Sequence, residues 1–396
     1  MSMRVAIGKS KKKDLREAVS EAVHSALFQM PAYSISLVLA FASPEFSSPS
    51  LIKNIKNHLH TNAPIIGCSA MGFITSLGIQ REGLVLAFLC LPQIKISSGF
   101  TTLSRDTNAF LLGQELGKHL IAGNSPLRRE LCLLFNDGLA ESSSDCISGL
   151  QSILGKSFPF IGAGASDNFK FQRTFQYYND DILHNSSTAC LLSGKLNYAI
   201  GIRHGWKPLG KIRTVTQSKA NMILQIDEEN ATSLYEGYFA KTLPQLKKEI
   251  SHINILYPIG IYLPGENEYL LRNVTSLNED GSITTQGNIP QGSPIRLMIG
   301  TKESCLEAAS EAAAYVKTAL KEKNLSLALI FSSASRLRIL GRDAEKEIKI
   351  IRDTLGEAVP IAGCYSYGEY APLAAAGYYG QSYLHNQTIL LLGIGA

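Results

Sequence analysis

One short motif occurs twice, at opposite ends of the chain. The first copy reads PIIGCSAMGF at residues 64–73 and the second reads PIAGCYSYGE at residues 360–369. In both copies a proline, two apolar residues, a glycine and a cysteine follow in that order. Proline is tolerated at the first residue of a strand, and glycine lets another backbone or a ligand approach closely. The motif therefore predicts a strand whose carboxyl end has a close neighbour.

An apolar run of strand length precedes each copy. These runs are SISLVLAFAS at residues 34–43 and LSLALIFSSA at residues 325–334. A fainter third copy has ELCLLFNDGL at residues 130–139 followed by PFIGAGASDN at residues 159–168. Runs of this length, bounded by turn residues, indicate buried strands. The same unit therefore occurs three times.

Each unit has further elements on both sides of this core. A short strand near Arg4, Ile94 or Ile295 is followed by a helix with apolar residues at three- and four-residue spacing, which gives one buried stripe. A last strand follows each motif, at residues 82–91, 187–196 and 387–395. Almost continuously apolar strands that alternate with helices indicate an α/β fold with covered sheets. We expect layered mixed sheets built from three related β-α-β-α-β-β units.

The segment between the second and third units has no counterpart elsewhere. Strand-like runs occupy residues 198–227, and a helical stretch follows at residues 232–248. We expect this piece to form a bridging α+β segment. A chain of 396 residues exceeds one ordinary core. We therefore expect one domain at residues 1–230 with two units and a second at residues 231–396 with the third.

Composition and charge narrow the possible partners. Hydrophobic residues make up 45% and charged residues 18% of the chain, as in ordinary globular proteins. The net charge of +5 is small for this length, so we expect no nucleic acid partner. The basic run GKSKKKDLR at residues 8–16 indicates a solvated turn, or alternatively a contact for an anionic partner.

Cysteine usage and hydropathy address cofactors and location. The seven cysteines are scattered and contain no C-x-x-C pair, which argues against a disulfide framework and a zinc site. No uninterrupted apolar segment reaches the roughly 18 residues that a membrane helix needs. We expect a cytoplasmic protein with no metal, no cofactor and no membrane insertion.

Two polar stretches are the best candidates for a binding site. YSYGE at residues 365–369 and LHNQT at residues 384–388 supply phenols, a carboxylate, an imidazole and amides near strand ends. The candidate ligand-binding residues there are Tyr365, Tyr367, Glu369, His385 and Asn386, together with Cys364 directly before the first stretch. These side chains either hold a small polar molecule or lock one strand to another, and the sequence leaves both readings open.

Four more residues complete the candidate set. Asp167 and Asn168 indicate a turn that could also touch a ligand. Trp206, the only tryptophan, lines a pocket or fills the junction between domains. Arg336 and Glu369 follow apolar strands of one unit, so they either hold the two ends of a zwitterionic ligand or form an ion pair with each other.

Several of these motifs resemble one known family. The stretch from PIAGCYSYGE to the final LHNQTILLLGIG is similar to the carboxy-terminal FIST domain. GAGASDN, GIRHGWKPLGKIRTVT and GCSAMGFI are similar to parts of the amino-terminal FIST domain. The resemblance covers essentially the whole chain. It implies a sensory module for a small ligand, often joined to signalling output domains, with amino acids and similar metabolites among the candidate ligands. A separate signalling partner protein is then an alternative to an attached output domain.

Three functional hypotheses follow. The first is an intracellular sensor that binds a small polar metabolite and signals through a conformational change. The second is an enzyme that uses a strand-end thiol, Cys68 or Cys364, or the side chains of Glu369 and His385. The third is a scaffold that binds protein partners through its helical faces. No histidine lies beside either cysteine in the sequence, which favours the sensor.

Overall fold

All three predicted units are present, and each builds a mixed sheet with the same strand order. The computed structural model describes residues 3–30, 34–59, 61–103, 107–123, 127–266, 268–375 and 378–395. The predicted α/β fold with layered mixed sheets is confirmed. The apolar runs at residues 37–41, 131–135 and 327–331 are the corresponding strands of the three units, as the repeat predicts.

The elements of the units follow the expected order. Unit one consists of β1 (Arg4–Ser10), α1 (Leu15–Gln29), β2 (Leu37–Ala42), η1 (Pro44–Phe46), α2 (Pro49–Leu59), β3 (Ile65–Ser69) and β6 (Leu84–Cys90). Unit two consists of β7 (Ile94–Thr102), α3 (Ala109–Ala122), β8 (Arg129–Asn136), α4 (Ser143–Leu154), β9 (Phe160–Gly164) and β12 (Ser186–Gly194). Unit three consists of β13 (Asn197–Arg203), α8 (Lys302–Ala319), β22 (Leu325–Ser333), α9 (Ala334–Leu340), η2 (Gly341–Asp343), α10 (Ala344–Leu355), β23 (Ile361–Ser366) and β26 (Ile389–Gly395).

The pairing within the units is identical. The strand orders are β1-β6-β2-β3, β7-β12-β8-β9 and β13-β26-β22-β23. In each unit the apolar strand and the P-x-x-G strand after it, together called the motif strands, are parallel. The last strand lies between the first strand of the unit and the apolar strand, and it is antiparallel to both. Because the motif strands are parallel, their carboxyl ends meet at one edge of each sheet, where open α/β sheets bind ligands.

Each unit also donates a hairpin to a neighbouring unit. The hairpins are β4 (Phe73–Thr75) with β5 (Gly78–Gln80), β10 (Gln176–Tyr178) with β11 (Asp181–Leu183), and β24 (Glu369–Ala375) with β25 (Tyr378–His385). β4 of unit one pairs with β23 of unit three, β24 of unit three pairs with β9 of unit two, and β10 of unit two pairs with β3 of unit one. The exchange is cyclic, and it extends every sheet to six strands.

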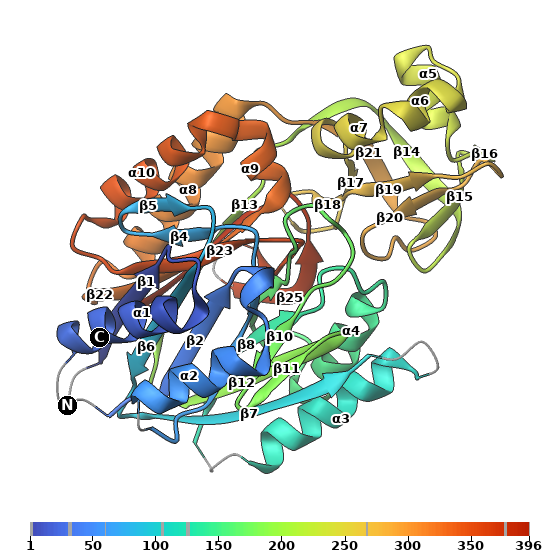
Figure 1. Cartoon of the computed structure of the whole chain (residues 1–396). Coiled ribbons are helices and arrows are strands. Elements are labelled where there is room, and N and C mark those ends of the chain that lie inside the picture. Colours follow the sequence, from blue (N-terminus) through green and yellow to red (C-terminus); the bar gives the residue numbers. More distant parts are fainter. Residues whose placement is uncertain are drawn as a thin grey trace.

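The bridging segment is a separate lobe between β13 and α8, called the insert here (Figure 1). It consists of β14 (Lys207–Lys219), β15 (Met222–Ile226), β16 (Glu229–Asn230), α5 (Ser233–Phe239), α6 (Leu243–Lys248), α7 (Ile250–Leu256), β17 (Ile259–Ile261), β18 (Leu270–Arg272), β19 (Val274–Leu277), β20 (Ile283–Thr285) and β21 (Pro294–Ile299).

The insert corrects one sequence prediction. The strand at Ile295 was expected to begin unit three, but it is β21, which pairs with β14 and β17 of the insert. β13 begins unit three instead, because it pairs with β26 as β1 pairs with β6. Residues 198–203, assigned to the bridge from the sequence, therefore belong to a unit. The domain boundary near residue 230 remains a prediction, and strand pairing crosses it.

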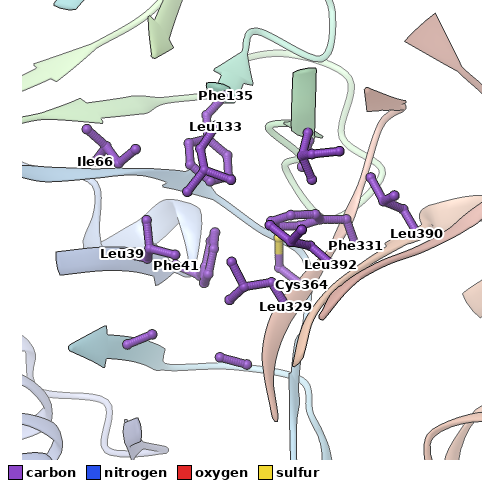
Figure 2. Close-up of a cluster of buried hydrophobic side chains, with 14 of the residues drawn as sticks. Leu39, Phe41, Ile66, Leu133, Phe135, Leu329, Phe331, Cys364, Leu390 and Leu392 are labelled. Carbon is purple, nitrogen blue, oxygen red and sulfur yellow. The ribbon is translucent and has the colours of Figure 1, made fainter. Parts of the chain in front are cut away.

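Equivalent phenylalanines from the three units meet in the central core (Figure 2). Phe41 of β2, Phe135 of β8 and Phe331 of β22 are fully buried. Their ring centroids lie 5.6, 5.9 and 5.8 Å apart in edge-to-face geometry. Edge-to-face rings add about 0.5–1.5 kcal/mol per pair beyond the burial of their area. The repeat thus places one aromatic ring from each unit at a shared centre.

The glycine of the repeated motif has a structural role in all three units. A Cβ atom at Gly67, Gly162 or Gly363 would lie 1.8, 1.7 or 1.8 Å from a carbonyl oxygen of the neighbouring parallel strand. Such contacts are impossible, so only glycine allows these strands to approach as they do. This contact explains why the motif recurs.

Membrane-spanning helices and metal-binding clusters are absent from the described residues. None of the helices there is long and apolar enough to cross a membrane. In the same part of the chain, no group of three or more histidine, cysteine, aspartate or glutamate side chains is arranged to hold a metal ion.

Candidate functional site

A cavity of about 330 Å³ lies where units two and three meet the insert. Its walls come from the segment after β8, from the loop that follows β9, from the start of α9 after β22, from the segment at residues 366–370 where β23 passes into β24, and from the insert. The insert contributes mainly amides and hydroxyls, namely Asn221, Ser251, Asn254, Asn273, Thr275, Thr285 and Gln286. A volume of this size suits a small metabolite.

The loop after β9 forms an aromatic wall of the cavity. Phe169 and Phe171 line the cavity together with Tyr367 of the YSYGE stretch. The rings of Phe171 and Tyr367 stack, with centroids 5.0 Å apart and planes inclined by 17°. Phe171 nevertheless keeps 61% of its surface exposed. One side of this ring is therefore covered by Tyr367 while much of the rest remains accessible.

Asp167 holds the backbone of this loop. One carboxylate oxygen accepts hydrogen bonds from the Phe171 N–H and the Tyr367 hydroxyl, both at 2.9 Å. The other oxygen accepts from the backbone N–H groups of Gln172 at 2.7 Å and Arg173 at 3.0 Å. Asp167 therefore organises the wall from behind, and it does not line the cavity.

The loop adopts a backbone conformation that needs this support. Asn168, Phe169 and Phe171 have φ angles of 59°, 58° and 51°. Left-handed conformations are uncommon outside glycine and cost free energy unless the surroundings enforce them, as they often do at functional sites. The Tyr367 hydroxyl contributes by accepting the Phe169 N–H at 2.6 Å. Asn168 itself is exposed on this loop.

Glu369 lies behind the cavity, fully buried. Its carboxylate accepts hydrogen bonds at 2.7 Å from the hydroxyls of Ser366 and Thr388. Burial raises the pKa of Glu369 to about 8, although these hydrogen bonds act in the opposite direction. Of these residues only Ser366 lines the cavity.

His385 is also buried and serves strand pairing. Its Nε2 atom lies 2.9 Å from the Ala371 carbonyl oxygen, so the ring donates from Nε2. Burial lowers the pKa of His385 to about 3, which keeps the imidazole neutral. His385 therefore joins β25 to β24, as one of the two sequence-based readings anticipated.

The residues after His385 connect unit three to the insert. Asn386 Oδ1 accepts the Asn273 N–H at 3.0 Å. Gln387 Nε2 donates to the Asn254 carbonyl oxygen at 2.7 Å and to Asn273 Oδ1. Both Asn254 and Asn273 line the cavity. The LHNQT stretch thus fixes the position of the cavity's amide wall.

Arg336 is buried and its partner is Glu347, not Glu369. Its Nε and Nη2 atoms donate to one oxygen of Glu347 at 3.0 and 2.6 Å. The remaining donors reach the carbonyl oxygens of His204 at 2.6 Å and Cys305 at 2.7 Å. The predicted Arg336–Glu369 ion pair is therefore wrong, because α10 brings a different carboxylate to the guanidinium.

The other predicted site residues are packed in the protein interior. Cys364 is fully buried in the central core, and burial raises the pKa of its thiol well above its usual value. Tyr365 is buried on the opposite face of its sheet. Trp206 donates its indole N–H to the Ile255 carbonyl oxygen at 3.1 Å and packs against Gly300. None of these three lines the cavity.

Of the ten residues predicted from the sequence, Tyr367 lines the cavity. Asp167, Glu369 and Asn386 are adjacent to it through the contacts above, and Asn168 directly precedes Phe169 of the cavity wall. Sequence reasoning missed Phe169, Phe171 and Arg338. A signal existed for the first two, since the aromatic pair in NFKFQR directly follows Asp167 in an otherwise polar loop.

Comparisons with known proteins agree with the sequence resemblance. The model of the FIST N domain matches residues 36–229, and the model of the FIST C domain matches residues 231–372. An uncharacterized protein of Mycobacterium tuberculosis is 21% identical over 398 residues, covering 98% of each chain. An uncharacterized protein of Methanocaldococcus jannaschii is 26% identical over 180 residues, which cover 43% of this chain but 34% of that relative.

Solved structures give only a distant match. PurL of T. maritima complexed with ADP aligns over 99% of this chain and 71% of its own, with 10% identity and a TM-score of 0.22. A similarity this low carries no argument about fold or ligand.

Proposed function

Because the chain belongs to the FIST family, whose domains are generally sensory and bind small ligands, we propose that it binds a small polar metabolite in this cavity and signals by moving the insert. The supporting observation is the position of the cavity between three separate parts of the fold. A ligand there contacts units two and three and the insert together. Its binding free energy therefore depends on how the insert is placed.

The contacts between the insert and unit three suit such a response. Asn386 accepts a hydrogen bond from the insert and Gln387 donates one to it. Gln286 Nε2 of the insert donates to the Tyr367 carbonyl oxygen at 2.5 Å. Hydrogen bonds of this kind stabilise by about 0.5–1.5 kcal/mol each, so a bound ligand can compete with them. Amino acids are candidate ligands, and a separate partner protein would receive the signal.

The residues of the enzyme hypothesis are less well placed. Cys68, Cys364, Glu369 and His385 are buried and none lines the cavity. A nucleophile or general base must reach the reacting atoms of a bound substrate. This placement supports the binding hypothesis. All seven cysteines are free and buried, which supports a reducing, cytoplasmic location.

A thermal-shift screen with amino acids and common metabolites tests binding. A ligand at 100 times its dissociation constant should stabilise the protein by about 2.7 kcal/mol. Thr275→Trp, which places a bulky side chain in the cavity wall, should abolish the shift. Thr214→Trp changes an exposed position of the insert that does not line the cavity, and it should leave the shift intact. The proposal fails if no compound stabilises the protein, or if Thr275→Trp responds like wild type.

A distance measurement tests the signalling half of the proposal. Spin labels on Glu229→Cys in the insert and Lys156→Cys in unit two should change their separation when the ligand found in the screen is added. Both positions are exposed, whereas the native cysteines are buried, so labelling is selective. An unchanged separation at saturating ligand would leave binding in place and contradict the movement of the insert.

A further inference from the structure

The cavity wall has features that select a class of ligand. Phe171 lines the cavity with 61% of its surface exposed. Tyr367 covers one side of it, and the loop that carries it is held in an uncommon backbone conformation by Asp167. The protein thus holds an aromatic ring in place with a side available for a second ring to stack on.

A cation lies beside this aromatic wall. Arg338 lines the cavity, and its guanidinium carbon is 5.6 Å from the centroid of the Phe169 ring. In the described part of the chain, no carboxylate lies within ion-pair distance of Arg338. A guanidinium offers a planar pair of donors that matches a carboxylate. Arg338 is therefore available to bind an anionic group.

Of the two acidic residues that line the cavity, Asp137 is already occupied by backbone donors. Asp137 is buried, and its two oxygens accept the backbone N–H groups of Leu139 at 2.8 Å and Asn185 at 3.0 Å. Glu141 is exposed to solvent, as Arg338 is, so the cationic probe below tests whether Glu141 attracts a cation instead. The stacking position over Phe169, which a ligand cation would favour, already holds Arg338.

From this arrangement we propose that the ligand is a flat aromatic or heteroaromatic acid. Its ring stacks on Phe171, its carboxylate pairs with Arg338, and the amides of the insert bind its other polar groups. This inference rests on the proposed function, and it narrows the ligand from polar metabolites in general to conjugated rings with an anionic group.

Four probes of similar size separate ring from charge. They are 2-naphthoate, its saturated analogue decahydro-2-naphthoate, the neutral 2-naphthamide, and the cationic 2-naphthylmethylammonium. Calorimetry should show that 2-naphthoate binds about tenfold more tightly than the saturated acid, which is the effect expected of one aromatic contact. It should also bind more tightly than the amide and the ammonium compound.

Matched variants locate the two contacts. Phe171→Leu should weaken 2-naphthoate about tenfold and leave the saturated acid unchanged, whereas Phe28→Leu, at an exposed position of α1 outside the cavity wall, should affect neither. Arg338→Gln should weaken 2-naphthoate but not 2-naphthamide. Arg342→Gln, also exposed and outside the cavity wall, is its control.

Several outcomes would overturn this ligand class. They are absence of 2-naphthoate binding, equal affinity for the saturated acid, tighter binding of the ammonium compound, or unchanged discrimination in Phe171→Leu and Arg338→Gln. If one of these occurs while another metabolite binds in a manner that Thr275→Trp blocks, the proposed sensory function stands and only the ligand class is wrong. If the metabolite screen also finds nothing, both proposals fail.

Discussion

Glu369 allows a quantitative test of the buried polar network behind the cavity. Burial raises its pKa from the usual 4.5 to about 8 in the folded protein. Between these values the folded state binds more protons than the unfolded state, so stability falls as pH rises. The favourable contribution is complete below pH 4.5 and is lost as pH rises to about 8. From pH 5 to pH 8 the loss amounts to roughly 3–4 kcal/mol.

His385 masks part of this effect in the wild-type protein. Its folded pKa of about 3 lies below the usual 6.5, so its contribution increases as pH rises from 3 to 6.5. Between pH 4.5 and pH 6.5, stability falls with pH because of Glu369 and rises with pH because of His385. A simple stability profile would therefore look nearly flat there, and a difference between two proteins is needed to isolate Glu369.

The variant for this measurement is Glu369→Gln, which resembles the protonated acid. Its amide can still hydrogen-bond to the hydroxyls of Ser366 and Thr388 that contact Glu369. Urea unfolding of both proteins at half-unit steps from pH 5 to pH 8.5 gives the difference in unfolding free energy. The unfolding free energy of wild type minus that of the variant should fall by roughly 3–4 kcal/mol as pH rises to 8. The contribution of His385 is present in both proteins and cancels in this difference.

The control is Glu229→Gln, which removes a carboxylate from an exposed strand of the insert. A difference between wild type and Glu369→Gln that stays constant from pH 5 to pH 8 would refute the reasoning. In that case Glu369 is ionised throughout, and the hydrogen bonds from Ser366 and Thr388 outweigh its burial.

Three further substitutions test other parts of the structure. Arg336→Gln should lower the unfolding free energy by about 3–5 kcal/mol, because it leaves Glu347 buried without its partner. The exposed Arg342→Gln should have little effect, and a loss below about 1 kcal/mol for Arg336→Gln in denaturant unfolding would contradict the prediction. Asp167→Asn should lower the unfolding free energy by about 1–3 kcal/mol, because the amide nitrogen cannot accept the N–H groups of Gln172 and Arg173. The exposed Asp181→Asn is the control, and equal unfolding midpoints for the two variants would show that the loop needs no carboxylate. Gly363→Ala should lower the unfolding free energy by at least about 1–3 kcal/mol through the clash with the Ile330 carbonyl oxygen, whereas the control Gly237→Ala has free space around the added methyl group. A thermal melt of Gly363→Ala like that of wild type would refute the strict need for glycine.

The sequence predicted the repeated units well because their signals are local. Each buried strand is a continuous apolar run, and each motif glycine meets a carbonyl oxygen of the next strand. The prediction of the strand at Ile295 failed because β21 and β13 are both short apolar strands, and both precede α8 in the sequence. Only long-range pairing with β26 distinguishes them, and no local pattern encodes it.

The candidate site was predicted less well for the same reason. Tyr367 was found because it follows a motif strand, and parallel strand ends meet at one edge. Arg338 and the amides of the insert come from segments that only the folded chain brings together. Arg336 was assigned the wrong carboxylate because Glu347 lies on a helix, where strand-end reasoning gives no information.

The cyclic exchange of hairpins restricts how this chain could change by recombination. Removing unit two, for example, would take away β9, on which β24 pairs, and also β10, which covers the edge of β3. Loss of any one unit would in this way leave a hairpin with no sheet and a sheet with an uncovered edge, and such edges promote aggregation. A gene that encodes three interlocked units can therefore lengthen within its loops, as the insert illustrates, but it cannot shed a single repeat and still encode a closed fold.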